Sequence, residues 1–243
     1  MTDADAAPCS VGVVVVAAGS GTRLGAGMPK AFVHLAGRPL ISHALDTAWR
    51  VPHLISLVVV APDGHEDPND PLDSLWDGVV LPPGTRVVAG GAERTDSVAA
   101  GLAALVDGVD IVLVHDAARC LTPLEVFERV VAAVAAGAAG AVPGVPVVDT
   151  IKAVDACGVI TATPDRSMLR AVQTPQGFRL GVLAAAYGSG VGATDDAALV
   201  EAMGERVVVV QGHADAFKVT TVLDLAHAER LLAARPPVPP PAH

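Results

Sequence analysis

Aromatic residues and cysteines are both scarce in this sequence. Aromatic residues make up 3% of the chain, whereas hydrophobic residues in total make up 51% and are mostly alanine and valine. Such a composition indicates an ordered globular domain with an aliphatic core rather than a disordered chain. The three cysteines, Cys9, Cys120 and Cys157, are odd in number, lie far apart and form no CxxC pair. This excludes a disulfide framework and a cysteine-based zinc site, and it favours a reducing, cytoplasmic location.

Basic residues are also few. The chain carries 16 Lys and Arg against 26 Asp and Glu, which gives a formal net charge of −10. Because duplex binding requires a basic face, this balance argues against a nucleic-acid partner. It leaves room for an anionic small molecule, since a local basic cleft can lie within an acidic protein.

The sequence offers no convincing membrane segment. Residues 130–148 carry no charge and are nearly long enough to cross a bilayer. They are rich in Ala and Gly, however, and contain Pro143 and Pro146, so we expect the end of a helix, a turn and a strand. The first ten residues are acidic and lack a basic n-region, so we also expect no signal peptide.

Strands and helices are predicted to alternate along most of the chain. Continuous β-branched runs are typical of strands that are buried on both faces. The predicted strands cover residues 11–17, 54–62, 85–91, 110–116, 140–147 and 206–212. The predicted helices cover residues 38–51, with Pro39 at the first helical position, 94–105, 122–136, with Thr122 as N-cap, 179–188, 195–203 and 222–234. This alternation predicts an α/β fold with a Rossmann-like, mostly parallel, twisted sheet flanked by helices.

The alternation is interrupted over residues 147–178. This segment contains short extended runs separated by turns, which predicts a projecting β-hairpin arm. Because isolated hairpins are marginally stable, we expect the arm to make a subunit contact in a homodimer. We expect one domain over 11–234 that includes this arm, a flexible stretch at 1–10, and a disordered, Pro-rich tail at 235–243. We expect no further enzyme to follow the last helix.

A glycine-rich loop follows the first predicted strand. It reads AAGSGTRLGAGMPK over residues 17–30. A Rossmann fingerprint would need a glycine at Leu24, and a P-loop would need Gly-Lys-Ser/Thr where Pro29, Lys30 and Ala31 stand. In both motifs the mismatched positions are ones that the phosphate-binding loop needs, a glycine for close backbone packing and a hydroxyl for Mg²⁺. This disfavours a dehydrogenase and a P-loop enzyme.

The remaining pattern, GxGTRx(5)PK, has its own physical logic. Small residues allow backbone N–H groups to approach the oxygens of a triphosphate. Arg23 and Lys30 add fixed positive charge beside them. In phosphoryl-type transfer a protein mainly positions groups and stabilises charge, so these residues are candidates for a reacting phosphate.

Several segments together resemble a known family. The loop resembles the nucleotidyltransferase signature, and the chain from 11 to 232 is similar to the 2-C-methyl-D-erythritol 4-phosphate cytidylyltransferases of the non-mevalonate isoprenoid pathway. The segments that carry the resemblance beyond the loop are GGAERTDSV, VLVHDAARC, DTIK, TPDRSMLRAVQTPQGF, ATDDA and FKVTT. The resemblance implies transfer of CMP from CTP to the phosphate of methylerythritol phosphate, with Mg²⁺ bound to the triphosphate.

The resemblance also implies a set of CTP contacts. Arg23 and Lys30 would stabilise charge on the α-phosphate, and the stretch from Gly91 to Ser97 would read cytosine, largely through its backbone. In that stretch Ala92 stands where the family commonly has an acidic or amide residue. The full CTP set comprises Ala17, Ala18, Gly19, Gly21, Arg23, Lys30, Gly91, Ala92, Ser97, Asp116 and Lys218.

A second set would bind the polyol phosphate, partly from a neighbouring subunit's arm. It comprises Asp116, Arg119, Thr150, Arg166, Thr174, Thr194 and Lys218, of which Arg166 and Lys218 join Arg23 and Lys30 as catalytic residues. No residue is a certain metal ligand, and Asp116 is the candidate. Taken alone, Asp116 could equally be a strand-end turn residue. We expect His115 to be a packed, hydrogen-bonded residue and Cys120 to be buried.

Three alternatives remain open from the residues. The chain could act on another polyol phosphate, such as ribitol 5-phosphate, because that branch shares the loop and the HDAAR segment. It could be a catalytically silent nucleotide-binding module, or, least in keeping with its loop, a dehydrogenase. No Ser-His-Asp or Cys-His nucleophile is evident, which agrees with a reaction whose nucleophile is already an anion.

Overall fold

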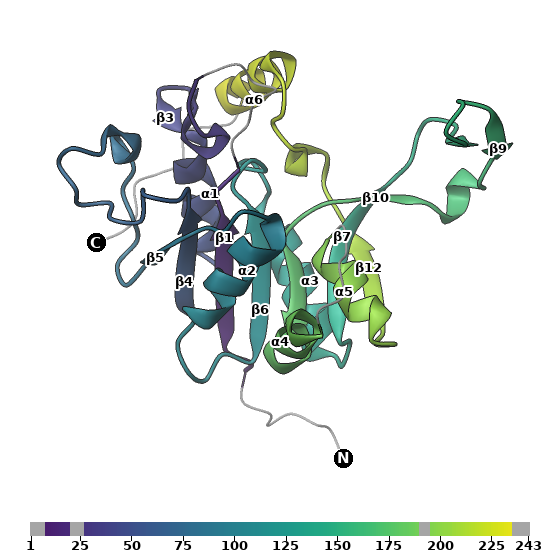
Figure 1. Cartoon of the computed structure of the whole chain (residues 1–243), viewed down its shortest axis with the longest axis horizontal. Helices are drawn as coiled ribbons and strands as arrows, with labels where there is room; N and C mark the ends of the chain where they lie inside the picture. Colours follow the sequence, from purple (N-terminus) through teal and green to yellow (C-terminus); the bar gives the residue numbers. More distant parts are fainter. Residues whose placement is uncertain (1–7, 20–26, 190–194, 235–243) are drawn as a thin grey trace.

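The computed structural model describes residues 8–19, 27–189 and 195–234. Its centre is an eight-stranded mixed sheet (Figure 1). Across the sheet the strands lie in the order β10 (Arg170–Val172), β7 (Gly140–Pro146), β11 (Gln176–Arg179), β6 (Ile111–Asp116), β1 (Val11–Val16), β4 (Leu54–Ala61) and β5 (Arg86–Ala89), with β12 (Val207–Gln211) paired to β7. The predicted α/β class with a mostly parallel sheet is confirmed.

Alternate residues of the strands face two separate layers of the core. On one face Val13 of β1 packs with helices α1 (Leu40–Ala48) and α3 (Leu124–Ala135). On the other face Val14 packs with α2 (Arg94–Ala103), α4 (Leu180–Gly188) and α5 (Asp196–Ala202). Both valines are fully buried, which is why β1 reads as an uninterrupted apolar run.

The last helix, α6 (Val222–Ala234), covers a smaller third cluster above the sheet. Its buried Ala228 packs with residues of the short hairpin formed by β2 (His34–Leu35) and β3 (Arg38–Pro39), and with Cys120, which is buried as predicted. No helix in the three described ranges is long and apolar enough to span a bilayer.

Two helix starts differ from the prediction. Pro39 precedes α1 instead of occupying its first position, and Pro123, not Thr122, is the residue before α3. The Thr122 hydroxyl donates to the carbonyl of Arg119 at 2.8 Å, so it closes the preceding turn instead of capping the helix. The expectation that Thr122 caps α3 is therefore wrong.

The interruption predicted over 147–178 consists of two structurally different parts. Residues 148–168 are exposed and project from the body of the molecule, with a small hairpin of β8 (Ala153–Val154) and β9 (Ile160–Ala162) and the single turn η4 (Arg166–Met168) (Figure 1). Strands β10 and β11 then return to the central sheet, and both run antiparallel to β7. β11 also pairs antiparallel with β6, so it fills the gap between β6 and β7.

Candidate active site

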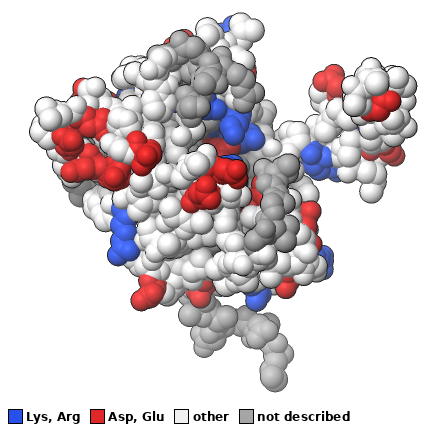
Figure 2. Space-filling view, in the orientation of Figure 1, with Lys and Arg blue, Asp and Glu red and all other residues white. Residues whose placement is uncertain are grey.

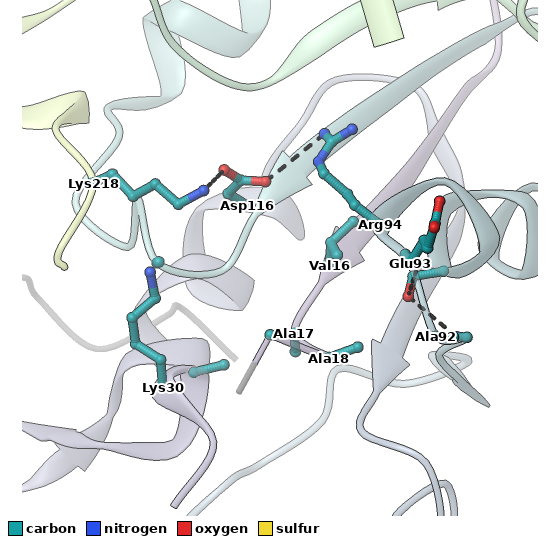
Figure 3. Close-up of a pocket in the computed structure, with 14 residues that line it drawn as sticks. Val16, Ala17, Ala18, Lys30, Ala92, Glu93, Arg94, Asp116 and Lys218 are labelled. Carbon is teal, nitrogen blue, oxygen red and sulfur yellow. Dashed lines mark hydrogen bonds and ion pairs between the residues drawn. The ribbon is translucent and has the colours of Figure 1, made fainter. Parts of the chain in front are cut away.

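A pocket of about 390 Å³ opens where β1, β5 and β6 end. Parallel strands bring their carboxyl ends to one edge of a sheet, and ligands of open α/β sheets bind at that edge. Figure 3 shows the pocket residues arranged around this opening. They are Val16, Ala17, Ala18, Gly19, Lys30, Ala31, Gly91, Ala92, Glu93, Arg94, Ser97, Asp116, Ala118 and Lys218.

The wall formed after β5 is too tight for larger side chains. A Cβ added at Gly90 would lie 2.5 Å from the Cβ of Ala18, and one added at Gly91 would lie 2.2 Å from the Cβ of Asp96. The Gly90 N–H donates to the Ala61 carbonyl at 2.8 Å, which fixes the start of this loop against β4. Gly90 therefore lets the loop lie against the end of β1, and Gly91 lets it lie against the first turn of α2.

Hydrogen bonds at the start of α2 fix the rest of this loop. Glu93 and Asp96 form a reciprocal capping box. The Ser97 hydroxyl donates to the Glu93 carbonyl at 3.1 Å and accepts from the Gly91 N–H at 3.2 Å. Ser97 therefore shapes the loop, in addition to lining the pocket, while Ala92 presents only a methyl group and backbone.

Asp116 lies at the centre of the charged side of the pocket. Its Oδ2 accepts a hydrogen bond from Lys218 Nζ at 2.7 Å, and its Oδ1 lies 3.9 Å from Arg94 Nη2 (Figure 3). Burial would raise the pKa of this carboxyl, but the charges of Lys218 and Arg94 outweigh it and lower the pKa of Asp116 to about 2. Asp116 is thus ionised at neutral pH.

Lys30 reaches the pocket from the short 3-10 turn η2 (Lys30–Phe32). Its backbone N–H donates to the Gly19 carbonyl at 3.4 Å, so the two ends of the glycine loop are joined. Figure 3 shows the Lys30 and Lys218 side chains converging on the same side of the pocket from different elements. In Figure 2 Lys and Arg side chains gather at a hollow that is bordered by Asp and Glu.

Arg119, Thr174 and His115 lie beside and beneath this charged group and do not line the pocket. The Thr174 hydroxyl accepts from the Asp116 N–H at 3.0 Å and bonds to His115 Nδ1 at 3.1 Å. Thr174 is buried, so it supports the strand end. His115 packs on Phe127, and burial lowers its pKa to about 4, as expected for a packed, uncharged histidine.

Arg119 is held mainly by backbone carbonyls. It donates to Ala216 at 2.8 Å and to Val172 at 3.3 Å, whereas its Nε is buried without a hydrogen-bond partner. Burial lowers the pKa of Arg119 and the charge of Asp116 opposes this effect. Arg119 therefore joins the end of β10 to the segment that carries Lys218.

Two of the predicted substrate residues lie on the projecting arm. Thr150 and Arg166 are exposed, and Arg166 Nη1 donates to the Val148 carbonyl at 2.7 Å. Within one chain the structure does not bring them to the pocket (Figure 1). Gly21, Arg23 and Thr194 lie outside the described residues.

Glu93 and Arg94 lie within the predicted base-reading stretch from Gly91 to Ser97, but the sequence prediction gave neither side chain a role. Both line the pocket, and Arg94 is bound by two hydrogen bonds to Asp196, which is 102 positions later in the helix predicted over 195–203. Asp195 is the residue that caps α5, through the Ala198 N–H at 3.0 Å. The sequence signal for these two residues is a charged pair, Glu93-Arg94, that follows directly after the Gly90-Gly91-Ala92 stretch.

The described residues contain no group of three or more His, Cys, Asp or Glu side chains arranged to hold a metal ion. Asp116 lines the pocket, and both of its oxygens face a positive charge, from Arg94 and from Lys218. A divalent ion would therefore need most of its ligands from a bound anion such as a triphosphate.

Comparison with known proteins identifies relatives along nearly the whole chain. Residues 11–234 match the family model described as IspD, 2-C-methyl-D-erythritol 4-phosphate cytidylyltransferase. A protein of that name from Nocardia farcinica is 51% identical over 237 residues, which cover 97% of this chain and 99% of that protein.

Two further comparisons concern a longer relative and a solved structure. A bifunctional enzyme IspD/IspF from Clavibacter michiganensis is 53% identical over 224 residues, and the chain spans 54% of its length. The crystal structure of 2-C-methyl-D-erythritol 4-phosphate cytidylyltransferase from Thermus thermophilus superposes with a TM-score of 0.74 at 35% identity, covering 93% of this chain and 100% of that one.

Proposed function

Because the chain belongs to the IspD family of 2-C-methyl-D-erythritol 4-phosphate cytidylyltransferases, we propose that its pocket is where CMP passes from CTP to 2-C-methyl-D-erythritol 4-phosphate. The chain is a nucleotidyltransferase of isoprenoid precursor synthesis. One observation carries the assignment to this pocket. Lys30 and Lys218, which both lie within the residues that match the family, converge in the cavity at the strand ends.

The reaction joins two phosphates. An oxygen of the polyol phosphate attacks the α-phosphorus of CTP, the bond from that phosphorus to the bridging oxygen breaks, and pyrophosphate leaves with its electron pair. Because the attacking oxygen is already anionic, no general base is required. The protein's task is to bring two anions together and to stabilise the additional charge of the transition state.

Lys30 and Lys218 serve this task from two different elements that converge on one side of the pocket, and Arg23 of the glycine-rich sequence motif joins them. The end of β1 supplies Ala17, Ala18 and Gly19, whose small side chains leave their backbone accessible to triphosphate oxygens. Gly21 of the same sequence motif is a further candidate for this contact. Lys218 reaches both substrates, since it extends from the segment beyond β12 towards Asp116.

The loop from Gly91 to Ser97 reads the base. Its backbone is fixed by the capping box and by Ser97, so the N–H and C=O groups are already oriented before nucleotide binds. Ala92 contributes no side-chain polar group. We expect selectivity for cytosine to depend on backbone contacts at this position, which a glycine substitution would largely preserve.

The polyol phosphate is bound by Asp116 and Arg119 of one chain together with Thr150 and Arg166 from a second chain's arm. The arm is exposed along almost its whole length, and Val154, Val159 and Ile160 are between 56% and 60% exposed. Apolar side chains on a thin projecting hairpin favour a partner that covers them. Sedimentation is expected to give a dimer, and a fully active monomer would exclude the shared site.

Magnesium fits this site as a companion of the triphosphate. The residues present supply one ionised carboxylate, Asp116, and phosphate oxygens would supply the remaining ligands. When bound, the ion would neutralise part of the triphosphate charge. We propose that Thr194 also binds the polyol phosphate, and that Thr174 acts on the substrate side through the end of β6, which its hydroxyl supports.

The cytoplasm is the proposed location, because Cys9, Cys120 and Cys157 are all free. We propose a single domain over 11–234, with the short flanks outside it. Cell fractionation with an antibody against the chain would test the location, and recovery of the protein in a secreted fraction would contradict it.

A substrate panel tests the function directly. Purified chain with CTP and Mg²⁺ should release pyrophosphate rapidly with 2-C-methyl-D-erythritol 4-phosphate and much more slowly with ribitol 5-phosphate. Faster turnover of ribitol 5-phosphate would support the other polyol branch. CTP binding without pyrophosphate release from any acceptor would identify a silent nucleotide-binding module.

A further inference from the structure

Asp196 is a buried carboxylate with no exposed surface, and it holds the pocket residue Arg94. Its two oxygens accept from Arg94 Nη1 and Nη2 at 3.0 and 2.7 Å, which is the bidentate geometry of a strong pair. Tyr187 donates its hydroxyl to Asp196 Oδ1 at 2.5 Å. Asp196 thus connects α4 and α5 to the first residue of α2.

Arg94 continues this connection into the pocket. Its side chain is 33% exposed and its Nη2 lies 3.9 Å from Asp116 Oδ1, while Lys218 occupies Asp116 Oδ2 at 2.7 Å. Four charges of alternating sign therefore follow one another from the core to the pocket: Asp196, Arg94, Asp116 and Lys218. Each interior member is held by opposite charges on two sides.

We propose that Asp196 and Arg94 are positioning residues that fix Asp116 and, through it, the ammonium group of Lys218. This role rests on the function proposed above for Lys218. A bidentate partner leaves Arg94 little freedom, so its remaining edge presents a constant positive charge to Asp116. Asp116 then keeps one oxygen towards Arg94 and the other towards Lys218.

The consequence of removing the Asp196 charge follows from these distances. In Asp196→Asn the amide N–H₂ would face guanidinium N–H groups, so Arg94 would lose its charged partner. Arg94 would then move towards Asp116 and compete with Lys218 for that carboxylate. Because Asp196 is fully buried, it cannot touch a substrate, and Arg94 is the pocket-lining residue to which it bonds.

A double-mutant cycle tests this transmission. Asp196→Asn in the full-length enzyme should lower kcat/KM for the polyol phosphate by about tenfold, within the range of coupled contacts. In a Lys218→Met background the same change should lower kcat/KM less than about twofold, because the group being positioned is already absent. An equal loss in both backgrounds would overturn the proposal.

Two further variants keep the test independent of folding effects. Should Asp196→Asn fail to fold, Arg94→Gln takes its place in the cycle with the same expected pattern. Arg94→Lys keeps the positive charge but loses the planar guanidinium that binds both oxygens of Asp196. It should therefore recover only part of the activity that Arg94→Gln loses. Full loss in both would assign Arg94 a direct substrate contact instead.

Asp46→Asn is the matched control. Asp46 also pairs with an arginine, Arg38 at 2.9 Å, but both side chains are about half exposed and lie outside the pocket lining. The control removes the same charge from the same kind of pair and should leave kcat/KM unchanged. A loss equal to that of Asp196→Asn would show an effect of net charge and contradict the proposal.

A spectroscopic readout separates this inference from the proposed function. The sequence has three lysines, Lys30, Lys152 and Lys218, so ¹³C-lysine side-chain signals are few enough to assign. In the free protein the Lys218 signal should shift in Asp196→Asn and stay in place in Asp46→Asn, while Lys152 on the arm stays in place in both. An unmoved Lys218 signal would refute the positioning role even in an active enzyme. If the Lys218 signal shifts in Asp196→Asn while the wild-type protein releases no pyrophosphate, the positioning role is supported and the proposed function is refuted.

Discussion

The charges around the pocket and the charges on the projecting arm are held in different ways. Asp116 accepts from Lys218 at 2.7 Å and faces Arg94 on its other oxygen. On the arm, the Arg166 side chain donates to the backbone carbonyl of Val148, and Lys152 donates to the Thr163 hydroxyl at 2.7 Å among exposed residues. The pocket is preorganised by its own chain, whereas the arm holds its candidate substrate residues, Thr150 and Arg166, in solvent.

This difference separates two kinds of site residue. Pocket residues are fixed before any ligand arrives, so they can stabilise charge without first being ordered. Arm residues gain a comparable environment only when another molecule covers them. The proposed function therefore requires both regions, and substitutions in each should fail in distinguishable ways.

The largest expected effect comes from removing a pocket cation. Lys30→Ala should lower turnover by a factor on the order of 10²–10³, because a fixed charge beside the reacting phosphate is lost. Steady-state pyrophosphate release measures the loss, and circular dichroism checks that the chain remains folded. Near-normal turnover would remove Lys30 from the catalytic group and weaken the contrast with the arm.

Acid should destabilise the pocket side before it affects the arm. The buried His115 has its pKa lowered from 6.5 to about 4, so between these values the unfolded chain binds more protons than the folded one. The free energy of unfolding should therefore fall by about 3 kcal/mol as the pH is lowered from 6.5 to 4.

Urea unfolding at pH 6.5, 5.2 and 4 measures this dependence. Asp116 adds its own loss only below its ordinary value of 3.8, as the pH approaches about 2. On the arm, the N–H of Ser167 lowers the pKa of the exposed Asp165, which therefore titrates below the His115 window as well. An unfolding free energy that stays constant from pH 6.5 to 4 would show that His115 is not held neutral in the folded state.

Complementation between chains tests whether the two regions meet across a dimer. Arg166→Ala should lower kcat/KM for the polyol phosphate by roughly 10- to 100-fold, the usual cost of losing a hydrogen bond to a charged group. A heterodimer of Arg166→Ala with Lys30→Ala, purified through two different tags, should regain about half of the wild-type turnover, since one of its two symmetric sites is intact. No recovery would place the pocket and its Arg166 in the same chain.

The smallest effect is expected from a lysine on the arm. Lys152→Ala removes the same side chain as Lys30→Ala, but from an exposed hydrogen bond to Thr163. The free energy of unfolding should change by less than about 0.5 kcal/mol, as is usual for exposed surface positions. A loss of several times that amount in thermal or urea unfolding would show that the arm is stabilised within its own chain.

Much of the fold follows from local sequence. The β-branched runs of β1, β4 and β6 and the helical spacing of α3 set these elements, because each is buried by its own neighbours in sequence and space. The return of residues 170–179 to the sheet could not be predicted in the same way. β11 is only four residues long, and its place depends on β6 and β7, to which no local pattern points.

The site residues also fall into two groups, those that local sequence motifs predict and those that depend on long-range packing. Lys30, Asp116 and Lys218 belong to sequence motifs, and the structure brings them to one pocket. The pairing of Arg94 with Asp196 and the support of Asp116 by Thr174 connect residues 102 and 58 positions apart. These pairs form because α2, α5 and β11 pack near the pocket. Local motifs do not show that packing, so they do not predict which residues pair.

The position of β11 between β6 and β7 also has a consequence for synthesis of the chain. β6 ends at Asp116 and its antiparallel neighbour begins at Gln176, so one edge of β6 stays open while roughly 60 further residues are made. At about 5–20 residues per second this interval lasts several seconds. During it an apolar strand edge is available to other nascent chains. The yield of this protein in a cell should therefore depend on translation speed and chaperone supply more than its final stability would suggest.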